Sequence, residues 1–244
     1  MSMLSSLHDL VALVTGASQG IGEAIARRLA QKGMRVIGSA RTLNRLEAAM
    51  ARLVQNGGEA VGIPCDLADP AATARLAHEA CRLYGRLDVL INNAGAPLKK
   101  PFHECTDAEW MHVLAVNSMA PFILCRELLP ALQKSPHATI IQIGSVMGIK
   151  GYEHQSVYAA SKHALMGFTK VMAQELQSHN IRVHTINPGG VNTALVQTMR
   201  PDLDPAGLIQ PEDIAEMVLF LLEHRGQAVI DDIHVRRASS APWY

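Results

Sequence analysis

Two side chains with acid–base chemistry, Tyr158 and Lys162, lie four positions apart in a stretch that predicts a helix over residues 156–179. That spacing places a phenol and an ammonium group on the same face of a helix. A free phenol titrates near ~10, and a fixed positive charge nearby favours the phenolate. We therefore expect Lys162 to lower the pKa of Tyr158 and prepare it for proton transfer. An ordinary exposed helix pair is the alternative, so the neighbouring motifs decide.

A glycine-rich turn near the start of the chain carries a second kind of chemistry. An apolar segment over residues 10–15 leads into Gly16, Gly20 and Gly22, and helical periodicity follows over residues 20–32. A strand, a glycine turn and a helix N-terminus together offer backbone N–H groups and the helix dipole to a pyrophosphate. The spacing G-x-x-x-G-x-G differs from the G-x-G-x-x-G of many dinucleotide sites, and a simple strand-to-helix loop is the alternative.

The elements that must position these residues alternate along the chain. Predicted strands cover residues 10–15, 34–39, 60–64, 87–91, 138–143, 181–186 and 228–234, and predicted helices cover 20–32, 42–56, 70–84, 107–134, 156–179 and 211–224. Continuous apolar strands joined by helices indicate an α/β fold, a doubly wound parallel sheet in one domain over residues 1–244. Such sheets bind ligands at the carboxyl ends of their strands, where the sequence places Gly16, Asp66, Asn92, Ser145 and Pro188.

Five motifs, in this order, resemble those of the short-chain dehydrogenase/reductase family in its simple form of roughly this length. They are Thr15–Gly22, Cys65–Leu67, Asn92–Gly95, the set Asn117, Ser145, Tyr158 and Lys162, and Asn187–Gly189. The resemblance covers about residues 8–235. It implies a Rossmann-like sheet of seven strands in the order 3-2-1-4-5-6-7. It also implies an enzyme that transfers hydride between a nicotinamide cofactor and a carbonyl or alcohol.

The resemblance also implies roles for individual residues. Tyr158 would be the general acid or base, Ser145 would bond the substrate oxygen, and Lys162 would also hold the nicotinamide ribose. Asn117 lies within a predicted helix, where asparagine is unfavourable, and the family implies a local irregularity that carries a proton relay to Lys162. A buried Asn117 satisfied by the backbone is the alternative. The implied cofactor site is Gly16, Ser18, Gln19, Gly20, Ile21, Gly22, Arg41, Asp66, Leu67, Asn93, Ala94, Gly95, Tyr158, Lys162, Pro188, Gly189, Val191 and Thr193.

Two further residues keep two interpretations each. Asp66 either accepts a hydrogen bond from the adenine ring, as the family implies, or caps the helix that follows it. Both roles are compatible with one carboxylate. Asn92 either contacts the cofactor or ties neighbouring strands together.

The end of the second predicted strand favours NADP over NAD. NAD enzymes of this fold carry an acidic residue there for the ribose 2′-OH, whereas this chain has Ala40 followed by Arg41. An arginine can clamp a 2′-phosphate with two hydrogen bonds, and a solvated arginine at a helix start is the alternative. Family members that use NADP often carry a second basic residue in the glycine turn, where this chain has Gln19.

Composition argues against several other classes of protein. Lys plus Arg and Asp plus Glu both total 22, so no basic surplus points to nucleic acid. No basic residue precedes Arg27, and apolar runs such as 217–222 are too short to span a bilayer, so we expect no signal peptide and no membrane partner. The 4 cysteines and 11 histidines lack metal-ligand spacing. We therefore expect no metal, reduced cysteines and a cytoplasmic location.

Four segments bear on the substrate and on assembly. The polar, proline-containing residues 194–210 predict a substrate-covering loop. The segment 230–237, Ile-Asp-Asp-Ile-His-Val-Arg-Arg, stands where the family usually has Asp-Gly-Gly, which leaves the role of residues 231–244 open. The helices 107–134 and 156–179 are apolar beyond one sheet-facing stripe, and the family pairs them across a two-fold axis, so we expect a homodimer or homotetramer. Candidate pocket residues, each equally well explained by packing or exposure, are Met147, Tyr152, His154 and Met199.

The interpretation that best joins these observations is an NADP(H)-dependent oxidoreductase that interconverts an alcohol and a small-molecule carbonyl, such as a ketone, an aldehyde or a 3-oxoacyl compound. One alternative is an NAD-dependent alcohol dehydrogenase of the sugar or steroid type. Another is a non-catalytic dinucleotide-binding regulator, since a fold alone does not determine function. The complete set of Ser145, Tyr158 and Lys162 argues against the regulator, because a sensor needs no proton-transfer group.

Overall fold

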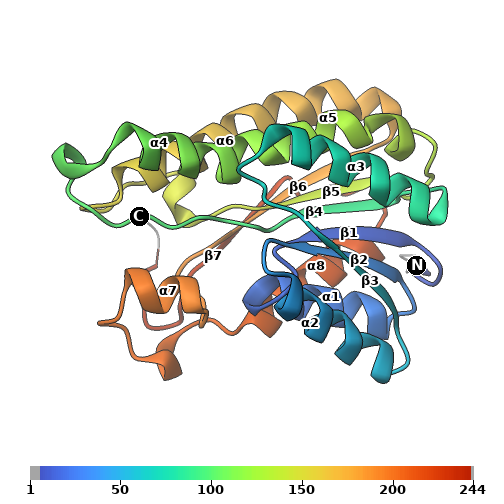
Figure 1. The fold of residues 1–244 in the computed structure, drawn as a ribbon, viewed down its shortest axis with the longest axis horizontal. Helices are drawn as coiled ribbons and strands as arrows, with labels where there is room; N and C mark the ends of the chain where they lie inside the picture. Colours follow the sequence, from blue (N-terminus) through green and yellow to red (C-terminus); the bar gives the residue numbers. More distant parts are fainter. Residues whose placement is uncertain (1–5, 243–244) are drawn as a thin grey trace.

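The computed structural model describes residues 6–242. Its centre is a parallel sheet with the strand order β3-β2-β1-β4-β5-β6-β7 (Figure 1). The strands are β1 Val11–Thr15, β2 Arg35–Ala40, β3 Glu59–Pro64, β4 Val89–Asn92, β5 Thr139–Ile143, β6 Arg182–Pro188 and β7 Asp232–Val235. The predicted fold class and strand order are therefore confirmed.

The central strands are apolar because the sheet is covered on both faces. Every residue of β1 and of β5 is buried. β1 pairs with β2 on one side and with β4 on the other, so Val14 stands opposite both Gly38 and Ile91. The strand order reverses at this point, and a doubly wound sheet opens a crevice there beyond the carboxyl ends of its strands.

Two layers of helices cover the sheet (Figure 1). One core includes Ile25, Leu46 and Val218, which belong to the layer formed by α1 Gly20–Gln31, α2 Leu43–Gln55 and α8 Pro211–Glu223. A second core includes Leu76 and Leu128. These residues belong to the opposite layer, formed by α3 Pro70–Tyr84, α4 Asp107–Leu114, α5 Ala120–Leu132 and α6 Ser156–Leu176.

The helix predicted over residues 107–134 is not uniform. It consists of α4, a π-helical turn over Ala115–Met119, and α5. Thr106 and Glu109 form a capping box where α4 begins, which satisfies two of its free N–H groups. A π-helical turn often accompanies a functional site, and this one contains Asn117.

The same helix is long and apolar enough to cross a bilayer by length and composition alone. It spans 26 residues, Asp107–Leu132, with a mean hydropathy of 1.3, so the prediction that every apolar run is too short overlooked it. Within the structure 44% of its most apolar window is buried, and Leu124, Leu128 and Leu132 belong to the core beneath α5. A helix packed in a protein core can have the same length and apolar composition as a membrane span, so one such helix is weak evidence for a span.

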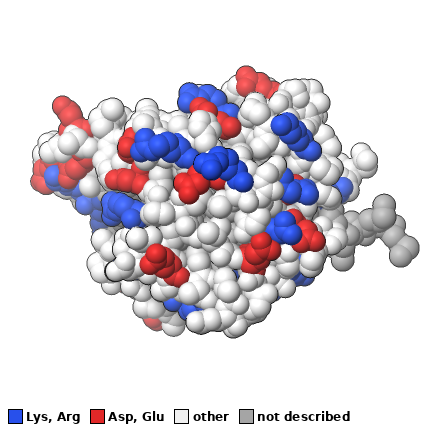
Figure 2. All heavy atoms as spheres, turned by 45° about the vertical axis from the view of Figure 1, so that its right-hand side comes forward, with Lys and Arg blue, Asp and Glu red and all other residues white. Residues whose placement is uncertain are grey.

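Charged side chains of both signs are interspersed on the face shown in Figure 2. Several pair across elements, and a row of three ion pairs joins α1 to α8: Arg27–Glu212, Arg28–Glu216 and Lys32–Glu223, at 2.6, 2.5 and 2.7 Å. Exposed pairs of this kind contribute little free energy each. Their regular spacing nevertheless aligns the two helices along their length.

Two predictions near the end of the chain differ from the structure. The strand predicted over residues 228–234 lies at Asp232–Val235 instead. Val229 and Ile230 are exposed, so apolar character misidentified which residues pair with β6. The loop predicted over 194–210 contains α7 Ala194–Met199 and a 3₁₀ turn, Pro205–Gly207. α7 begins there because the hydroxyl of Thr193 accepts a hydrogen bond from the backbone N–H of Val196.

Candidate active site

A cavity of about 640 Å³ opens at the carboxyl ends of the strands, and most of the predicted cofactor-binding residues line it. They are Gly16, Ser18, Gln19, Gly20, Ile21, Arg41, Asp66, Leu67, Asn93, Ala94, Gly95, Tyr158, Lys162, Pro188, Gly189, Val191 and Thr193. Ser145 lines an adjoining chamber. Gly22 and Asn117 line neither cavity, so a role of either residue in the site depends on neighbouring residues that do. The fold thus gathers side chains from most of the length of the chain at one edge of the sheet.

The glycine turn forms a cradle with no room for side chains. Gly16 and Gly20 have φ angles of +68° and +57°, which glycine adopts without steric cost. A Cβ on Gly16 would lie 2.8 Å from Nδ2 of Asn93, and one on Gly22 would overlap the carbonyl oxygen of Gly16. Gln19 precedes α1 and gives it no side-chain cap, so the first N–H groups of the helix point to the cavity as donors. This geometry fits a phosphate group.

Asn93 locks this cradle to the end of β4. Its Nδ2 donates to the carbonyl oxygen of Thr15 at 2.8 Å. The backbone N–H groups of Asn93 and Ala94 donate to the Thr15 hydroxyl at 3.0 and 3.1 Å. The Asn93 amide is therefore occupied in positioning the turn. Asn92, by contrast, is buried and donates to Sγ of Cys125 at 3.6 Å, which agrees with its role as a tie between elements.

Asp66 is exposed at the rim of the cavity. Its Oδ1 accepts a hydrogen bond from the N–H of Ala68 at 3.0 Å. The residue that caps α3 is Asp69, which accepts from the N–H of Ala71 and precedes Pro70 at the first helical position. The interpretation of Asp66 as the helix cap is therefore wrong, because the cap of α3 lies three residues later, at Asp69. Contact with an adenine ring stays a prediction.

Two arginines face the region beyond β2. Arg41 and Arg45 both line the cavity, beside Thr42 and Gln19, and Nη1 of Arg45 lies 3.5 Å from Oε1 of Gln19. The sequence analysis missed Arg45 because it lies in the first turn of α2 and reads as ordinary helix surface. The fold brings it over the glycine turn, where it supplies the second positive charge that Gln19 does not.

Tyr158 and its neighbours form a buried polar group in the site. Tyr158, Ser145 and Lys162 are 7%, 9% and 3% exposed. Burial raises the pKa of Tyr158 to about 12, and a hydrogen bond with Ser145 offsets part of this rise. Nζ of Lys162 lies 5.9 Å from the centre of the Tyr158 ring. The prediction that Lys162 lowers the pKa of Tyr158 is therefore wrong for this structure, because loss of solvation dominates and the hydrogen bond with Ser145 provides the only opposing effect.

Lys162 is directed to the end of β5. Its Nζ donates to the carbonyl oxygen of Ile143 at 3.1 Å, and burial lowers the pKa of Lys162 to about 8. An amine with this pKa gains and loses protons close to neutral pH, as a relay requires. Tyr158 is thus held as a protonated phenol beside an amine that exchanges protons readily.

Asn117 occupies the predicted helix irregularity and is also bonded to the backbone. Its Oδ1 accepts from the N–H of Ala96 at 2.7 Å, and its Nδ2 donates to the Ala96 carbonyl at 3.0 Å. Nδ2 also donates to Oγ of Ser161 at 2.9 Å, one residue before Lys162. Asn117 therefore ties the loop after β4 to α6. A proton relay through it stays a prediction.

Asn187 has a positioning role that its motif did not reveal. Its Oδ1 accepts from the backbone N–H of Ser145 at 3.0 Å, and its Nδ2 donates to Oδ1 of Asp232 at 2.5 Å. A Cβ on Gly144 would overlap Oδ1 of Asn187, so glycine at 144 permits this contact. Ser145 is thereby held from β6 and β7, which the sequence could not show because the three residues lie far apart in the chain.

A chamber of about 410 Å³ continues from Ser145 and Tyr158 toward α7. Tyr158 and Gly189 line both this chamber and the larger cavity, so the phenol stands where the two meet. Three of the four predicted pocket residues line the chamber, namely Met147, Tyr152 and Met199, and His154 does not. The arrangement provides a long cavity for a dinucleotide and a smaller one for a substrate.

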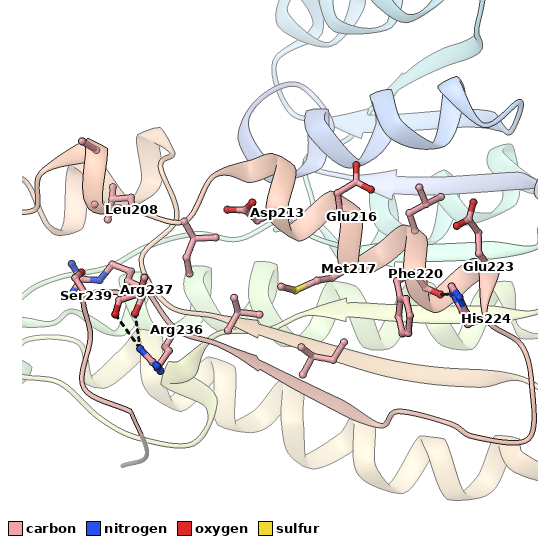
Figure 3. Close-up of a pocket in the computed structure, with 17 residues that line it drawn as sticks. Leu208, Asp213, Glu216, Met217, Phe220, Glu223, His224, Arg236, Arg237 and Ser239 are labelled. Carbon is pink, nitrogen blue, oxygen red and sulfur yellow. Dashed lines mark hydrogen bonds between the residues drawn. The ribbon is translucent and has the colours of Figure 1, made fainter. Parts of the chain in front are cut away.

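Residues 236–241 wall the chamber on one side. The guanidinium of Arg236 donates to the carbonyl oxygens of Arg237, Ala238 and Ser240 at 3.1, 3.3 and 2.8 Å, and Figure 3 shows the first two of these bonds. A wider hollow of about 890 Å³ lies between α8, β7 and this tail (Figure 3). Neither Tyr158 nor Ser145 lines that hollow, so it is separate from the proton-transfer group.

The sulfur and imidazole groups form no further site in the described part of the chain. Over residues 6–242, no three His, Cys, Asp or Glu side chains gather as metal ligands would. Cys65, Cys81, Cys105 and Cys125 carry free thiols. Burial raises the pKa of the Cys125 thiol to about 12, which makes it a poor nucleophile.

Known proteins resemble this chain over most of its length. A family model described as short chain dehydrogenase matches residues 10–204. YxjF of Bacillus subtilis (strain 168), described as an uncharacterized oxidoreductase, is 37% identical over 216 residues, or 88% of this chain and 84% of that protein. The 3-oxoacyl-(acyl-carrier-protein) reductase FabG of Escherichia coli (strain K12) is 36% identical over 219 residues, or 86% of this chain and 88% of that protein.

A solved structure gives the same result in three dimensions. A metagenomic short-chain oxidoreductase in complex with NADP superposes with a TM-score of 0.85 at 38% identity, covering 97% of this chain and 100% of that one. The match includes the sheet, both helical layers and the edge at which the cavities open. By sequence and by fold, the chain belongs to the short-chain dehydrogenase family of oxidoreductases.

Proposed function

We propose that this protein is an NADP(H)-dependent oxidoreductase that interconverts a carbonyl compound and the corresponding alcohol. The observation that carries the proposal is the position of the Tyr158 hydroxyl, buried beside Ser145 where the dinucleotide-sized cavity meets the substrate-sized chamber. A protonated phenol at that junction is suited to donate to a carbonyl oxygen. The whole chain, residues 1–244, acts as one dinucleotide-binding domain.

The residues of the larger cavity fit NADP. The cradle of Gly16, Gly20 and Gly22 has no room for side chains and offers N–H donors to a pyrophosphate. Arg41 and Arg45 place two positive charges where a ribose 2′-phosphate would lie, and no acidic residue stands at the end of β2. The solved relative described above binds NADP. The nicotinamide supplies the hydride for reduction or accepts it in oxidation.

The protein's own residues then manage the proton. Ser145, held through its N–H by Asn187, donates a hydrogen bond to the substrate oxygen and stabilises the negative charge that develops on it. Tyr158 donates its proton to that oxygen during reduction and takes it back during oxidation. Lys162 supports proton return, since burial holds the pKa of its amine at about 8. α7 and the tail line the chamber, where they would limit the access of water.

The substrate is a small-molecule carbonyl or alcohol. Relatives include 3-oxoacyl reductases and a 3beta-hydroxysteroid dehydrogenase. Neither family membership nor the set of Asn117, Ser145, Tyr158 and Lys162 therefore decides between acyl, sugar and steroid substrates. An NAD-dependent sugar- or steroid-type dehydrogenase is the second candidate. This candidate would require that Arg41 and Arg45 discriminate only weakly between NADP and NAD. The free thiols of the four cysteines agree with a cytoplasmic location.

The protein also assembles as a homodimer or homotetramer under this proposal. Large apolar side chains remain exposed on α4 and α5: Trp110 at 42%, Met111 at 60% and Phe122 at 48%. Phe122 packs edge-on against Phe168 of α6, with ring centres 6.0 Å apart. Exposed apolar groups gathered on one layer favour burial against a second copy.

Absorbance of NADPH in the presence of ketones, aldehydes and 3-oxoacyl thioesters tests the function. We expect oxidation of NADPH with at least one of these classes and a fall of ~10²–10⁴ in turnover for Tyr158→Phe, the range of general acid–base groups. Binding of NADPH, measured by fluorescence titration, should change little in that variant. Undiminished turnover in Tyr158→Phe would show that the proton comes from another group.

A further inference from the structure

Four positive side chains gather around the chamber that adjoins Tyr158. Lys150, Arg200, Arg236 and Arg237 all line it, and no aspartate or glutamate of residues 6–242 does. Their surroundings differ. Arg200 makes a bidentate pair with Asp202 at 2.8 and 2.6 Å, which neutralises much of its charge, and Nζ of Lys150 lies 5.1 Å from the centre of the Tyr152 ring.

Arg237 is the cation whose guanidinium is free for a ligand. Its side chain is half-buried and passes close to Gly190, where a Cβ would lie 3.5 Å from Cδ of Arg237. Within residues 6–242 it forms no side-chain hydrogen bond and no ion pair. A half-buried guanidinium without an acceptor is costly, and it presents a planar fork of donors that matches a carboxylate.

The preceding residue fixes the position of Arg237. The guanidinium of Arg236 donates to three carbonyls of the tail, and the N–H of Ser240 donates to the carbonyl of Arg237 at 2.9 Å. The tail is therefore a closed turn anchored on β7 (Figure 3). Arg236 keeps its charge, because carbonyl oxygens do not neutralise it. The turn thus holds Arg237 where the chamber adjoins the wider hollow, since Arg237 lines both, and Arg236 beside it adds a second charge.

We propose that the substrate of this enzyme carries a carboxylate, which Arg237 binds while the carbonyl group of the same molecule meets Ser145 and Tyr158. The inference rests on the proposed function, since it assigns the chamber to the substrate. It gives the segment 236–241 a role in selecting oxo-carboxylic acids over neutral ketones, esters and thioesters. A neutral substrate would leave the half-buried guanidinium of Arg237 without an acceptor, and that penalty discriminates against it.

The test compares a series of oxo-carboxylic acids of increasing chain length with their methyl esters and with a neutral 3-oxoacyl thioester. One charge-assisted pair contributes about 1.5–3 kcal/mol, so we expect kcat/KM for the best acid to exceed that for its ester by about ten- to hundredfold. The advantage should shrink as salt is added, because salt screens the charges at the mouth of the chamber. Equal or better turnover of the ester or thioester would overturn the proposal.

Three variants locate the effect. Arg237→Gln should lower the ratio of acid to ester turnover by about tenfold, and Arg237→Lys should restore part of it, because a point charge lacks the fork geometry. Arg82→Gln removes one exposed charge from α3, a helix that contributes no residue to the chamber, and should leave the ratio of acid to ester turnover unchanged. An unchanged ratio in Arg237→Gln would assign the selectivity elsewhere and overturn the role of Arg237.

A binding measurement separates this inference from the proposed function. If no carbonyl compound is reduced and no hydroxy acid is oxidised, the proposed function fails. Calorimetric titration of the NADP⁺-saturated protein with the same acids and esters then decides the inference. Tighter binding of the acids, weakened about tenfold in Arg237→Gln, would support a carboxylate site. Equal binding of acid and ester would overturn it.

Discussion

At the scale of the residue, burial controls the chemistry more than pairwise charge does. Tyr158 and Lys162 are neighbours on one helix face, yet desolvation shifts the pKa of each in the direction that favours its neutral form. The phenol is therefore a proton donor and the amine a ready exchanger. The sequence could show which residue types were present but not how deeply they would lie, and depth decides the direction of both shifts.

Lys162 should cost the protein stability in return for this function. Because its pKa is lowered from 10.5 to about 8 by burial, the folded state disfavours the charged amine. The cost is fully present below pH 8 and disappears as the pH rises toward 10.5. We expect Lys162→Met to be more stable than the parent protein at pH 7 by roughly 2 kcal/mol, after allowing for the lost bond to Ile143.

The measurement is urea unfolding of both proteins between pH 7 and pH 10.5. The difference in unfolding free energy between the two proteins should narrow over that range. Other groups titrate equally in both proteins, so their contributions to this difference cancel. Lys162→Met should at the same time lose turnover. A variant less stable than the parent at pH 7 would show that Lys162 contributes more through its bond to Ile143 than its burial costs.

Arg41 and Arg45 should together account for cofactor preference. Either Arg41→Ala or Arg45→Ala should weaken NADPH binding by about ten- to hundredfold, as expected for one charge-assisted contact with a phosphate. NADH binding should be nearly unaffected, because it lacks the 2′-phosphate. Fluorescence titration with both cofactors measures this. Equal losses for NADH and NADPH would place these arginines elsewhere on the nucleotide, and a loss confined to Arg41→Ala would leave Arg45 without a role.

At the scale of the element, strand and helix positions were largely predictable, but irregularities were not. Period and apolar character identified seven strands and six long helices, because each must bury a continuous face. The π-helical turn within 107–134 was expected at Asn117 only through family resemblance. α7 and the shift of the last strand to Asp232–Val235 escaped prediction, since a short capped helix and a short edge strand depend on local hydrogen bonds.

The same limit applies to the candidate site. Residues in compact motifs, such as the glycine turn, could be named from the chain alone. The roles of Arg45 and Asn187 could not, because each contacts a residue distant in sequence, and that of Arg237 could not, because it depends on a chamber formed by the fold. Only the folded chain shows that Arg45 reaches Gln19 and that Asn187 holds Ser145.

The π-helical turn should be a mechanical link between α5 and the loop after β4. Asn117→Ala would leave the N–H and the carbonyl of Ala96 without their partners, and we expect a loss of about 1–3 kcal/mol in unfolding free energy. Asn56→Ala is a suitable control, since Asn56 bonds one exposed helix carbonyl. Denaturant unfolding compares them. A loss no larger than that of the control would mean that water replaces the Asn117 amide.

At the scale of the whole molecule, the proposed assembly draws attention to two apolar surfaces among the described residues. One lies on α4 and α5 and includes Trp110, Met111 and Phe122. The other lies on α8, where Phe220 is 45% exposed and stacks on His224 with ring centres 4.2 Å apart. The two surfaces belong to opposite layers of the sheet (Figure 1), so each could meet a different copy of the chain.

Substitutions on these two surfaces should distinguish a dimer from a tetramer. Phe122→Glu should abolish the dimer formed through α4 and α5, because burying a carboxylate in an apolar interface is costly. Phe220→Glu should reduce a tetramer to a dimer and leave a dimer intact. Light scattering at micromolar concentration gives the mass of each. A monomeric parent protein would refute the assembly altogether.

The hydrogen bond between Asn187 and Asp232 affects the order in which parts of the site can form during synthesis of the chain. Ser145 is held by Asn187, and Asn187 is held by a strand that leaves the ribosome about ninety residues after Ser145. A nascent chain can therefore form the glycine cradle early while its serine is still unanchored. We therefore expect a chain that ends before residue 232 to lack the contact that holds Asn187, and with it the fixed position of Ser145.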